Sequence, residues 1–233
     1  MWPFPKSKTL LSSGVFQGMT DCHSHILPGV DDGVRTLEES LAILDRYEKL
    51  GMKAVWLTPH IMEDIPNKPS VLKEKFEALK KAYNGGLELH LGAENMIDNL
   101  FEKRLEERDL LLMGSRQDHL LVETSYFTPP YGFYDILERI KSIGYFPVLA
   151  HPERYVYMTE KDYDRLKEMK ILFQMNLFSF AGYYGKEPRH VAEGLLKKHY
   201  YDYVGTDIHR LSMIEGSIGR PVESKLLYPF RSL

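Results

Sequence analysis

The chain has 233 residues, of which 43% are hydrophobic and 27% are charged, and its formal net charge is −3. These values are typical of a soluble globular protein, and the length fits one α/β barrel. The small negative charge provides no basic surplus to neutralise phosphates along a duplex, so nucleic acid is excluded as an expected partner. The single cysteine cannot form an internal disulfide and fits a reducing compartment, so we expect a cytoplasmic protein.

The first 18 residues, MWPFPKSKTLLSSGVFQG, contain two prolines among the first five positions and no apolar run as long as that of a signal peptide. We expect residues 1–18 to be a partly disordered lead-in and residues 19–233 to form one domain. No stretch approaches the roughly 18 apolar residues of a membrane-spanning helix, so direct insertion into a membrane is not expected.

Short apolar segments alternate along the chain with amphipathic segments, which is typical of βα units and a parallel sheet. Strands are predicted over residues 19–25, 53–60, 87–94, 119–125, 146–153, 171–179 and 202–209. The clearest helix is predicted over 37–50, where Thr36 and Glu39 can form a capping box and Gly51 can end the helix. Weaker helical patterns cover 71–83, 133–143, 162–169 and 190–198.

Polar side chains that can bind a metal stand at the C-terminal ends of nearly all these strands. They are His23, His25, His60, Glu94, Glu123, His151, Asn176, Asp207 and His209. In a closed parallel barrel the C-terminal strand ends meet on one face, whereas an open sheet would spread them along an edge. We therefore predict a single-domain α/β fold, a distorted seven-stranded (β/α)7 TIM-like barrel.

The stretch MTDCHSHILPGVDDG is the densest of these motifs. Alternation along a strand puts His23 and His25 on one face, and the following Pro-Gly turn brings Asp32 back towards the strand end. Paired imidazoles of this kind are natural ligands for Zn, Mn or Fe. Cys22 points to the other face and has proline, not arginine, six positions later, so we interpret it as a small buried hydrophobe rather than a nucleophile.

Two later motifs extend the pattern. AHPERY places His151 and Arg154 immediately after an apolar strand, and a guanidinium offers a fixed fork of donors for phosphate oxygens. GTDIH places Asp207 and His209 two positions apart, as in the first histidine pair. The chain contains no P-loop, no dinucleotide glycine fingerprint and no G-x-S-x-G elbow.

Together these motifs resemble the polymerase and histidinol phosphatase (PHP) superfamily, whose fold is a distorted seven-stranded barrel that holds three metal ions. DCHSHILPGVDDG, TPH, GAE, VETS, AHPERY and GTDIH are similar, in this order, to motifs of the bacterial tyrosine-protein phosphatases of capsule and exopolysaccharide gene clusters. The resemblance runs from about residue 18 to residue 209.

The resemblance implies three divalent metal ions, with manganese as the first expectation and iron, zinc or magnesium also compatible with the ligand types. One ion would be held by His23, His25 and Asp207 and share Glu94 with the second, which Glu123 and His151 would complete; Asp32, His60 and His209 would hold the third. Arg154 would bind the phosphate and, with Asp207, serve catalysis. Arg210, directly after the last histidine, is a second candidate for substrate binding, with Arg220 further along as its alternative.

We therefore predict a metal-dependent protein-tyrosine phosphatase in which a metal-activated hydroxide attacks phosphorus. By resemblance, its partner would be the phosphotyrosine tail of a membrane-bound bacterial tyrosine kinase that regulates polysaccharide synthesis. The alternatives are a small-molecule phosphatase of the histidinol-phosphate type, a non-catalytic metal-binding regulatory barrel, and an amidohydrolase-type barrel. All nine candidate ligands are present, which argues against the non-catalytic barrel. Two-metal sites of amidohydrolases often use a bridging modified lysine. This sequence offers Glu94 and Glu123 instead, which argues against the amidohydrolase-type barrel.

Overall fold

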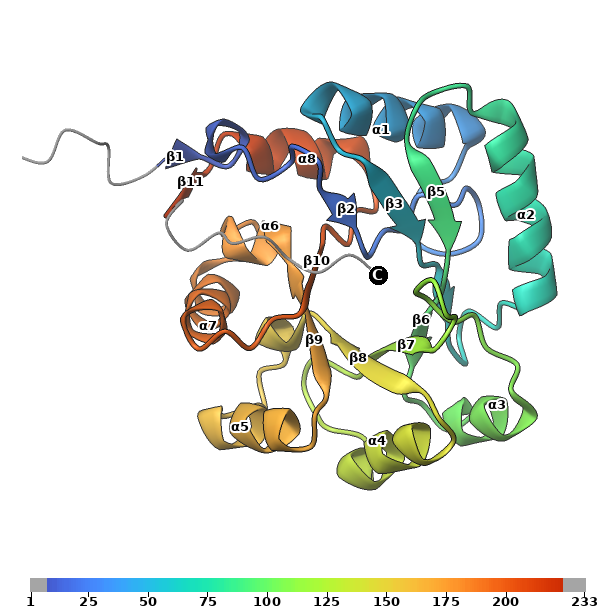
Figure 1. The fold of residues 1–233 in the computed structure, drawn as a ribbon, viewed down its shortest axis with the longest axis vertical. Coiled ribbons are helices and arrows are strands. Elements are labelled where there is room, and N and C mark those ends of the chain that lie inside the picture. Colours follow the sequence, from blue (N-terminus) through green and yellow to red (C-terminus); the bar gives the residue numbers. More distant parts are fainter. Residues whose placement is uncertain (1–7, 224–233) are drawn as a thin grey trace, which may run out of the picture.

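Parallel strands form the wall of a barrel in the computed structural model, which describes residues 8–223 (Figure 1). The wall contains β2 (Thr20–Asp21), β3 (Ala54–Leu57), β4 (His60–Ile61), β5 (Glu88–Leu91), β6 (Glu94–Met96), β7 (His119–Glu123), β8 (Phe146–Ala150), β9 (Leu172–Asn176) and β10 (Tyr203–Gly205). One sheet has the order β10-β9-β8-β7-β6-β4 and a second the order β2-β3-β5, with every pairing parallel.

Two of the seven predicted strands are interrupted, and this explains the distortion of the barrel. Residues 58–59 separate β3 from β4, and residues 92–93 separate β5 from β6. As a result β3 pairs with β2 on one side and with β5 on the other, whereas β4 and β6 continue into the other sheet. The ring closes where Cys22 N–H donates to Val204 O at 3.0 Å and His25 N–H donates to Ile208 O at 2.9 Å. The predicted seven-stranded barrel is confirmed.

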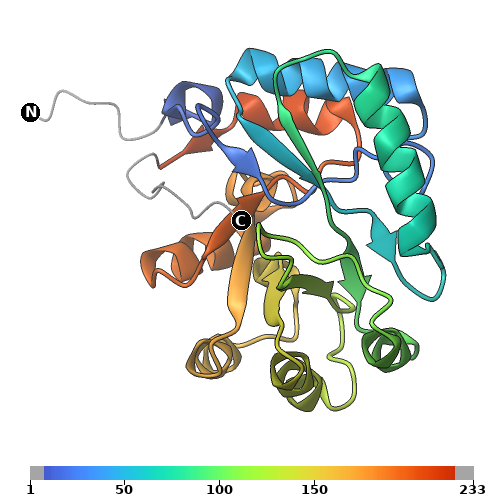
Figure 2. The ribbon, with the colours of Figure 1, turned by 45° about the vertical axis from the view of Figure 1, so that its right-hand side comes forward.

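Helices surround the strands on the outside, as Figures 1 and 2 show. They are α1 (Leu37–Leu50), α2 (Pro69–Ala82), α3 (Phe101–Glu107), α4 (Phe133–Ser142), α5 (Glu160–Glu168), α6 (Leu177–Phe180), α7 (Lys186–Lys197) and α8 (Leu211–Ile218). The predicted capping box of α1 is present, and Gly51 ends this helix in the left-handed conformation. Helix α7 begins four residues before its predicted start, because Gly185 precedes it and a proline is tolerated in a first helical turn.

Residues 8–18 of the predicted lead-in are ordered against the barrel. Strand β1 (Lys8–Thr9) pairs antiparallel with β11 (Pro221–Val222), and a short 3-10 helix (Leu11–Ser13) follows. Leu10 and Phe16 are buried in the main core, so apolar burial fixes residues 8–18 on the barrel. The rest of the predicted lead-in, residues 1–7, lies outside the described residues.

Two hydrophobic clusters support the wall. The larger one lies between the helices and the strands, and the smaller one fills the barrel with side chains from several strands, among them Cys22, Trp56, Leu121, Val148 and Tyr203. Cys22 is thus the small buried hydrophobe that the sequence predicts. Within residues 8–223, no helix combines the length and the apolar character that crossing a bilayer requires.

Candidate metal centre

The nine predicted metal ligands meet at the C-terminal end of the barrel. Buried among them are His23, His25, His60, Glu94, Glu123, His151 and Asp207, while His209 is half-buried and Asp32 is exposed at the rim. Donor atoms form three groups, and within each group they lie within 4.8 Å of one another. The groups are His23, His25, Glu94 and Asp207; His60, Glu94 and Glu123; and His25, Asp32, His60 and His209. The barrel thus brings residues from distant parts of the chain into three adjoining groups.

The first group is completely buried. His23 Nε2 lies 3.0 Å from Glu94 Oε2, and His25 Nε2 lies 3.2 Å from Asp207 Oδ1. The Nε2 atoms of the two histidines are 3.1 Å apart, so the H-x-H pair converges as its spacing predicts. This group matches the first ligand set that the resemblance implies.

The other two groups share residues more widely than the resemblance implies. His60 presents Nδ1 to Glu123 Oε1 at 3.0 Å and Nε2 to Asp32 at 3.5 Å, so it stands between the second and third groups. His151 Nε2 lies 3.0 Å from Glu94 Oε1 and 3.9 Å from Glu123 Oε2, beside the second group. The proposed ligands of the second and third ions therefore adjoin each other through His60.

Two residues that the sequence analysis did not select orient the first histidine pair. His23 Nδ1 lies 2.8 Å from Gln174 Oε1, and His25 Nδ1 lies 2.8 Å from Asp31 Oδ2. In the neutral imidazole, a proton that Nδ1 donates to these oxygens leaves Nε2 without one and free to bind a cation. The sequence offered one signal for each of these two residues. Gln174 is a polar residue in the apolar strand LFQMN, and Asp31 is the first aspartate of VDDG, from which only Asp32 was chosen as a ligand.

The backbone at the strand ends is unusual. His151 has φ 33° and Asp207 has φ 53°, a left-handed conformation that non-glycine residues rarely adopt. Beside them Gly205 is required for a different reason: a Cβ at this position would lie 2.5 Å from His23 Cβ. Backbone strain and close packing thus both concentrate where the candidate ligands meet.

Charges in the centre reinforce one another. Burial disfavours the charged form of His23, but the carboxylates of Glu94 and Asp207 outweigh this effect and raise the pKa of His23 to about 9. Burial also acts against ionisation of these two carboxyls, yet the neighbouring histidines hold the pKa of both Glu94 and Asp207 below its ordinary value. The carboxylates are therefore ionised near neutral pH, the form that binds cations.

The donor set fits divalent metal ions. Within the described part of the chain, four buried atoms of the centre make no well-aligned hydrogen bond, although three of them have a close ion-pair neighbour: His60 Nδ1, Glu94 Oε2, Glu123 Oε1 and His151 Nδ1. Leaving buried polar atoms unsatisfied costs about 1–3 kcal/mol each, so such a cluster needs a compensating ligand. Nitrogen and oxygen donors without a thiolate suit Mn, Fe, Zn or Mg.

Arg154 lies at the edge of the first group. Its Nη1 is 2.6 Å from Asp207 Oδ2, and its guanidinium lies between the rings of Tyr126 and Tyr184, 4.4 and 4.3 Å from their centroids. The two tyrosines were not singled out from the sequence as contacts of Arg154. Asn176 Nδ2 also donates to Asp207 Oδ2, at 3.2 Å.

The other two arginines considered from the sequence lie elsewhere. Arg210 is exposed, next to His209 at the rim. Arg220 donates from Nη1 to Gly182 O at 2.7 Å and from Nε to Gly216 O at 2.7 Å, so it fastens a loop instead of facing the centre. Of the two, Arg210 is the better placed for a substrate.

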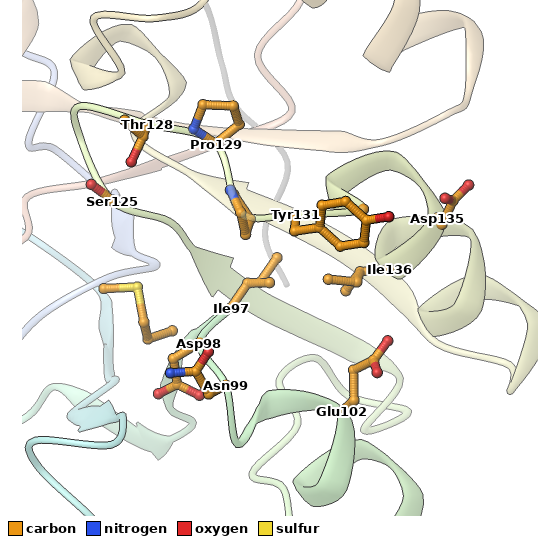
Figure 3. Close-up of a pocket in the computed structure, with 13 residues that line it drawn as sticks. Ile97, Asp98, Asn99, Glu102, Ser125, Thr128, Pro129, Tyr131, Asp135 and Ile136 are labelled. Carbon is orange, nitrogen blue, oxygen red and sulfur yellow. The ribbon is translucent and has the colours of Figure 1, made fainter.

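A cavity of about 800 Å³ lies beside the centre, between the loops that follow β6 and β7. Figure 3 shows Asp98, Asn99 and Glu102 on one side of this cavity and Tyr131, Asp135 and Ile136 on another. Met96, in its lining, pairs in register with the candidate ligand Glu123. The cavity therefore adjoins the second ligand group and offers room for a substrate larger than a phosphate.

Residues 19–221 match the family described as capsular polysaccharide synthesis, CpsB/CapC. The chain belongs to this family. Among the CpsB/CapC-like relatives, the tyrosine-protein phosphatase YwqE of Bacillus subtilis is 30% identical over 203 residues, which cover 83% of this chain and 78% of YwqE. The putative tyrosine-protein phosphatase CapC of Staphylococcus aureus is 26% identical over 226 residues, covering 92% of this chain and 84% of CapC.

The fold agrees with this CpsB/CapC membership. A solved structure from the work on YwqE of Bacillus subtilis and CpsB of Streptococcus pneumoniae, described as unique metal-dependent tyrosine phosphatases, superposes with a TM-score of 0.77 at 25% sequence identity. The match covers 89% of this chain and 84% of the solved chain. The resemblance that the motifs indicated is thereby confirmed for both sequence and fold.

Proposed function

We propose that the chain is a metal-dependent tyrosine-protein phosphatase of the CpsB/CapC capsule family. The observation that carries the proposal is the meeting of nine nitrogen- and oxygen-bearing side chains with the guanidinium of Arg154 at one barrel mouth. The names of the related proteins YwqE and CapC, both tyrosine-protein phosphatases by description, support the choice of a phosphotyrosine substrate.

Three divalent metal ions, with manganese as our first choice, would be held by the three groups of donors, with His151 completing the second group. When bound, the ions would supply Lewis acidity and positive charge for the hydrolysis of a phosphate ester. Gln174 and Asp31 keep the Nε2 atoms of His23 and His25 available as ligands.

Arg154 would bind the substrate phosphate. Its guanidinium is held by the Asp207 carboxylate and by two aromatic faces, which leaves other N–H groups of the fork available for phosphate oxygens. Asp207 has two functions in this arrangement, since Oδ1 belongs to the first ligand group and Oδ2 orients Arg154. The phenolate leaving group, with a pKa near 10, requires less protonation than an alkoxide.

We further propose that the substrate is the phosphotyrosine tail of a membrane-bound bacterial tyrosine kinase and that the enzyme acts in the cytoplasm. Membership of a capsular polysaccharide synthesis family supports this partner. The cavities beside the centre suit a peptide better than a small ester, because they extend the site well beyond the volume of one phosphate.

The test is turnover of a phosphotyrosine peptide by the full chain, with chelator and after re-addition of Mn²⁺. We expect activity that chelator abolishes and Mn²⁺ restores, a loss of at least about a hundredfold in His151→Ala, and retention in Cys22→Ala because Cys22 lies in the apolar barrel interior. Activity that ignores chelator but disappears in Cys22→Ala would contradict the proposal. A strong preference for histidinol phosphate over the peptide would replace it with the small-molecule alternative.

A further inference from the structure

A second cavity, of about 430 Å³, opens beside the metal centre on the side where strands β2 and β10 meet. Asp32 and His209 of the third ligand group form part of its lining, and Arg35 and Arg210 form another part. A group bound in this cavity would therefore lie next to the reacting phosphate but outside the ligand groups.

The two arginines are available for a ligand. Both residues are exposed, and within residues 8–223 neither guanidinium has an ion pair or a hydrogen bond. The one further acid in the lining is Glu39, whose carboxylate accepts from the backbone N–H of Arg35 at 3.0 Å and of Thr36 at 3.3 Å. Glu39 is engaged in the capping box of α1 and Asp32 belongs to the third ligand group, so within residues 8–223 neither carboxylate pairs with the two guanidiniums that line the cavity.

Helix α8 adds to the positive potential of this cavity. It begins at Leu211, which lines the cavity, and its N-cap residue Arg210 makes no capping hydrogen bond through its side chain. The first turn of α8 contains no acidic residue. The positive end of the helix dipole is thus uncompensated by side chains and favours a negative group there.

The cavity on the far side of the centre has the opposite character. Asp98, Glu102 and Asp135 contribute carboxylates to its lining, and Figure 3 shows Asp135 next to Tyr131 and Asp98 next to Asn99. Asp98 pairs with Arg104 at 2.8 Å and Glu102 with Arg139 at 3.2 Å. Strands β6 and β7 lie across the ring from β2 and β10, so among the described residues the unpaired guanidiniums of Arg35 and Arg210 lie on one side of the rim and the unpaired carboxylate of Asp135 on the other. An anion beside the reacting group is therefore attracted to the Arg35 side.

We propose that Arg35 and Arg210 form an anion subsite for a second negatively charged group, a carboxylate or a phosphate, on the peptide whose phosphotyrosine occupies the centre. The proposal rests on the proposed phosphatase function and adds substrate selectivity to it. Guanidinium forks bind both kinds of anion, and at an exposed rim their effect depends on ionic strength.

The experiment compares KM for phosphotyrosine peptides that carry Ala, Lys, Glu or a non-hydrolysable phosphotyrosine mimic at each flanking position in turn. For the wild-type chain we expect one position at which Glu lowers KM about fivefold relative to Ala and the phosphonate mimic lowers it further, with kcat nearly unchanged. In the Arg35→Ala/Arg210→Ala variant this ratio should fall to less than about twofold, and about 0.5 M salt should have the same effect on the wild type.

The matched control is Arg108→Ala/Arg116→Ala, which removes the same charge from turns at the other end of the barrel, at the end of α3 and before β7. Its KM ratio should equal that of the wild type. Turnover with equal KM for the Ala and Glu peptides at every flanking position would overturn the subsite but not the phosphatase function. An equal loss of the KM ratio in the control variant would do the same. No turnover of any peptide would contradict the phosphatase function; calorimetric binding of the phosphonate peptides to the same variants would then decide on the subsite.

Discussion

Asp31 lies directly behind His25, completely buried, and accepts from His25 Nδ1 at 2.8 Å and from the His60 backbone N–H at 3.0 Å. An asparagine would fit the space but would not carry the charge that holds His25 in its metal-binding form. We predict that Asp31→Asn lowers metal affinity or activity by about 10- to 100-fold, the range usual for such partners of metal ligands.

Metal content by mass spectrometry and activity in excess Mn²⁺ would measure this effect. Asp45→Asn is a suitable control, because Asp45 makes only a surface ion pair, at 2.5 Å, with Lys49 on helix α1. Full metal content together with wild-type activity in Asp31→Asn would show that the carboxylate is not needed to orient His25.

His23 makes metal uptake dependent on pH. Its pKa of about 9 in the metal-free chain means that it is protonated at neutral pH, whereas a ligating imidazole must be neutral. Uptake should therefore release a proton from His23 and become stronger as the pH rises towards 9. The stability of the metal-free fold depends on pH in the opposite direction. Charged His23 makes its full contribution to the free energy of unfolding below its ordinary pKa of 6.5, and this contribution is lost as the pH rises through 9.

Calorimetric titration with Mn²⁺ in buffers of different ionisation enthalpy would count the released protons between pH 6.5 and 8.5. The expected result is a positive count and an affinity that increases with pH. An affinity independent of pH, with no proton release, would contradict the charged state of His23.

At the scale of elements, the loop between α6 and α7 carries Tyr184 onto Arg154, and Arg220 fastens this loop through Gly182 O. A cation–π contact of a largely buried guanidinium contributes about 1–2 kcal/mol. We predict that Tyr184→Leu raises KM for a phosphotyrosine peptide by about 5- to 30-fold, whereas Tyr184→Phe, which keeps the ring, stays within about threefold. Steady-state kinetics would check this, and equal KM values for the two variants would show that the ring face does not position Arg154.

The elements also show how far the sequence could predict this protein. Strand alternation and the capping box of α1 placed the barrel and its best helix, because both patterns depend on local spacing. Helices α3, α6 and α8 were not predicted, since they are short and are stabilised by packing. The fold of residues 8–18 could not be predicted, because their few apolar residues become informative only once β1 pairs with β11.

The same reasoning applies to the site. The nine candidate ligands could be chosen because they are metal-binding residue types at or near strand ends, and the structure brings eight of them into the three donor groups and places His151 beside the second. Asp31, Gln174 and Tyr184 could not be assigned in this way, since each acts on a partner that is fixed only by the tertiary fold. Which donors share an ion likewise depends on angles between strands that no motif encodes.

For the whole molecule, metal binding should contribute strongly to stability, because among the described residues the buried carboxylates of Glu94 and Glu123 pair with histidines but with no lysine or arginine. A ligand at one hundred times its Kd stabilises a folded protein by about 2.7 kcal/mol for one site. For a domain of this size that corresponds to a Tm change of about 5–11 °C. We therefore predict a fall in Tm of at least this size when chelator is added, measured by calorimetry at fixed pH. An unchanged Tm would argue against tightly held ions.

The closure of the ring between β2 and β10 has a consequence for biosynthesis. Two of the three donor groups combine residues near the start of the barrel with Asp207 or His209, which a ribosome makes after all the other donors. While β10 is still inside the ribosomal exit tunnel, only the His60, Glu94 and Glu123 group can be complete. Phosphatase competence therefore arrives only once β10 has joined β2, and a chain terminated before Asp207 could not assemble the whole centre.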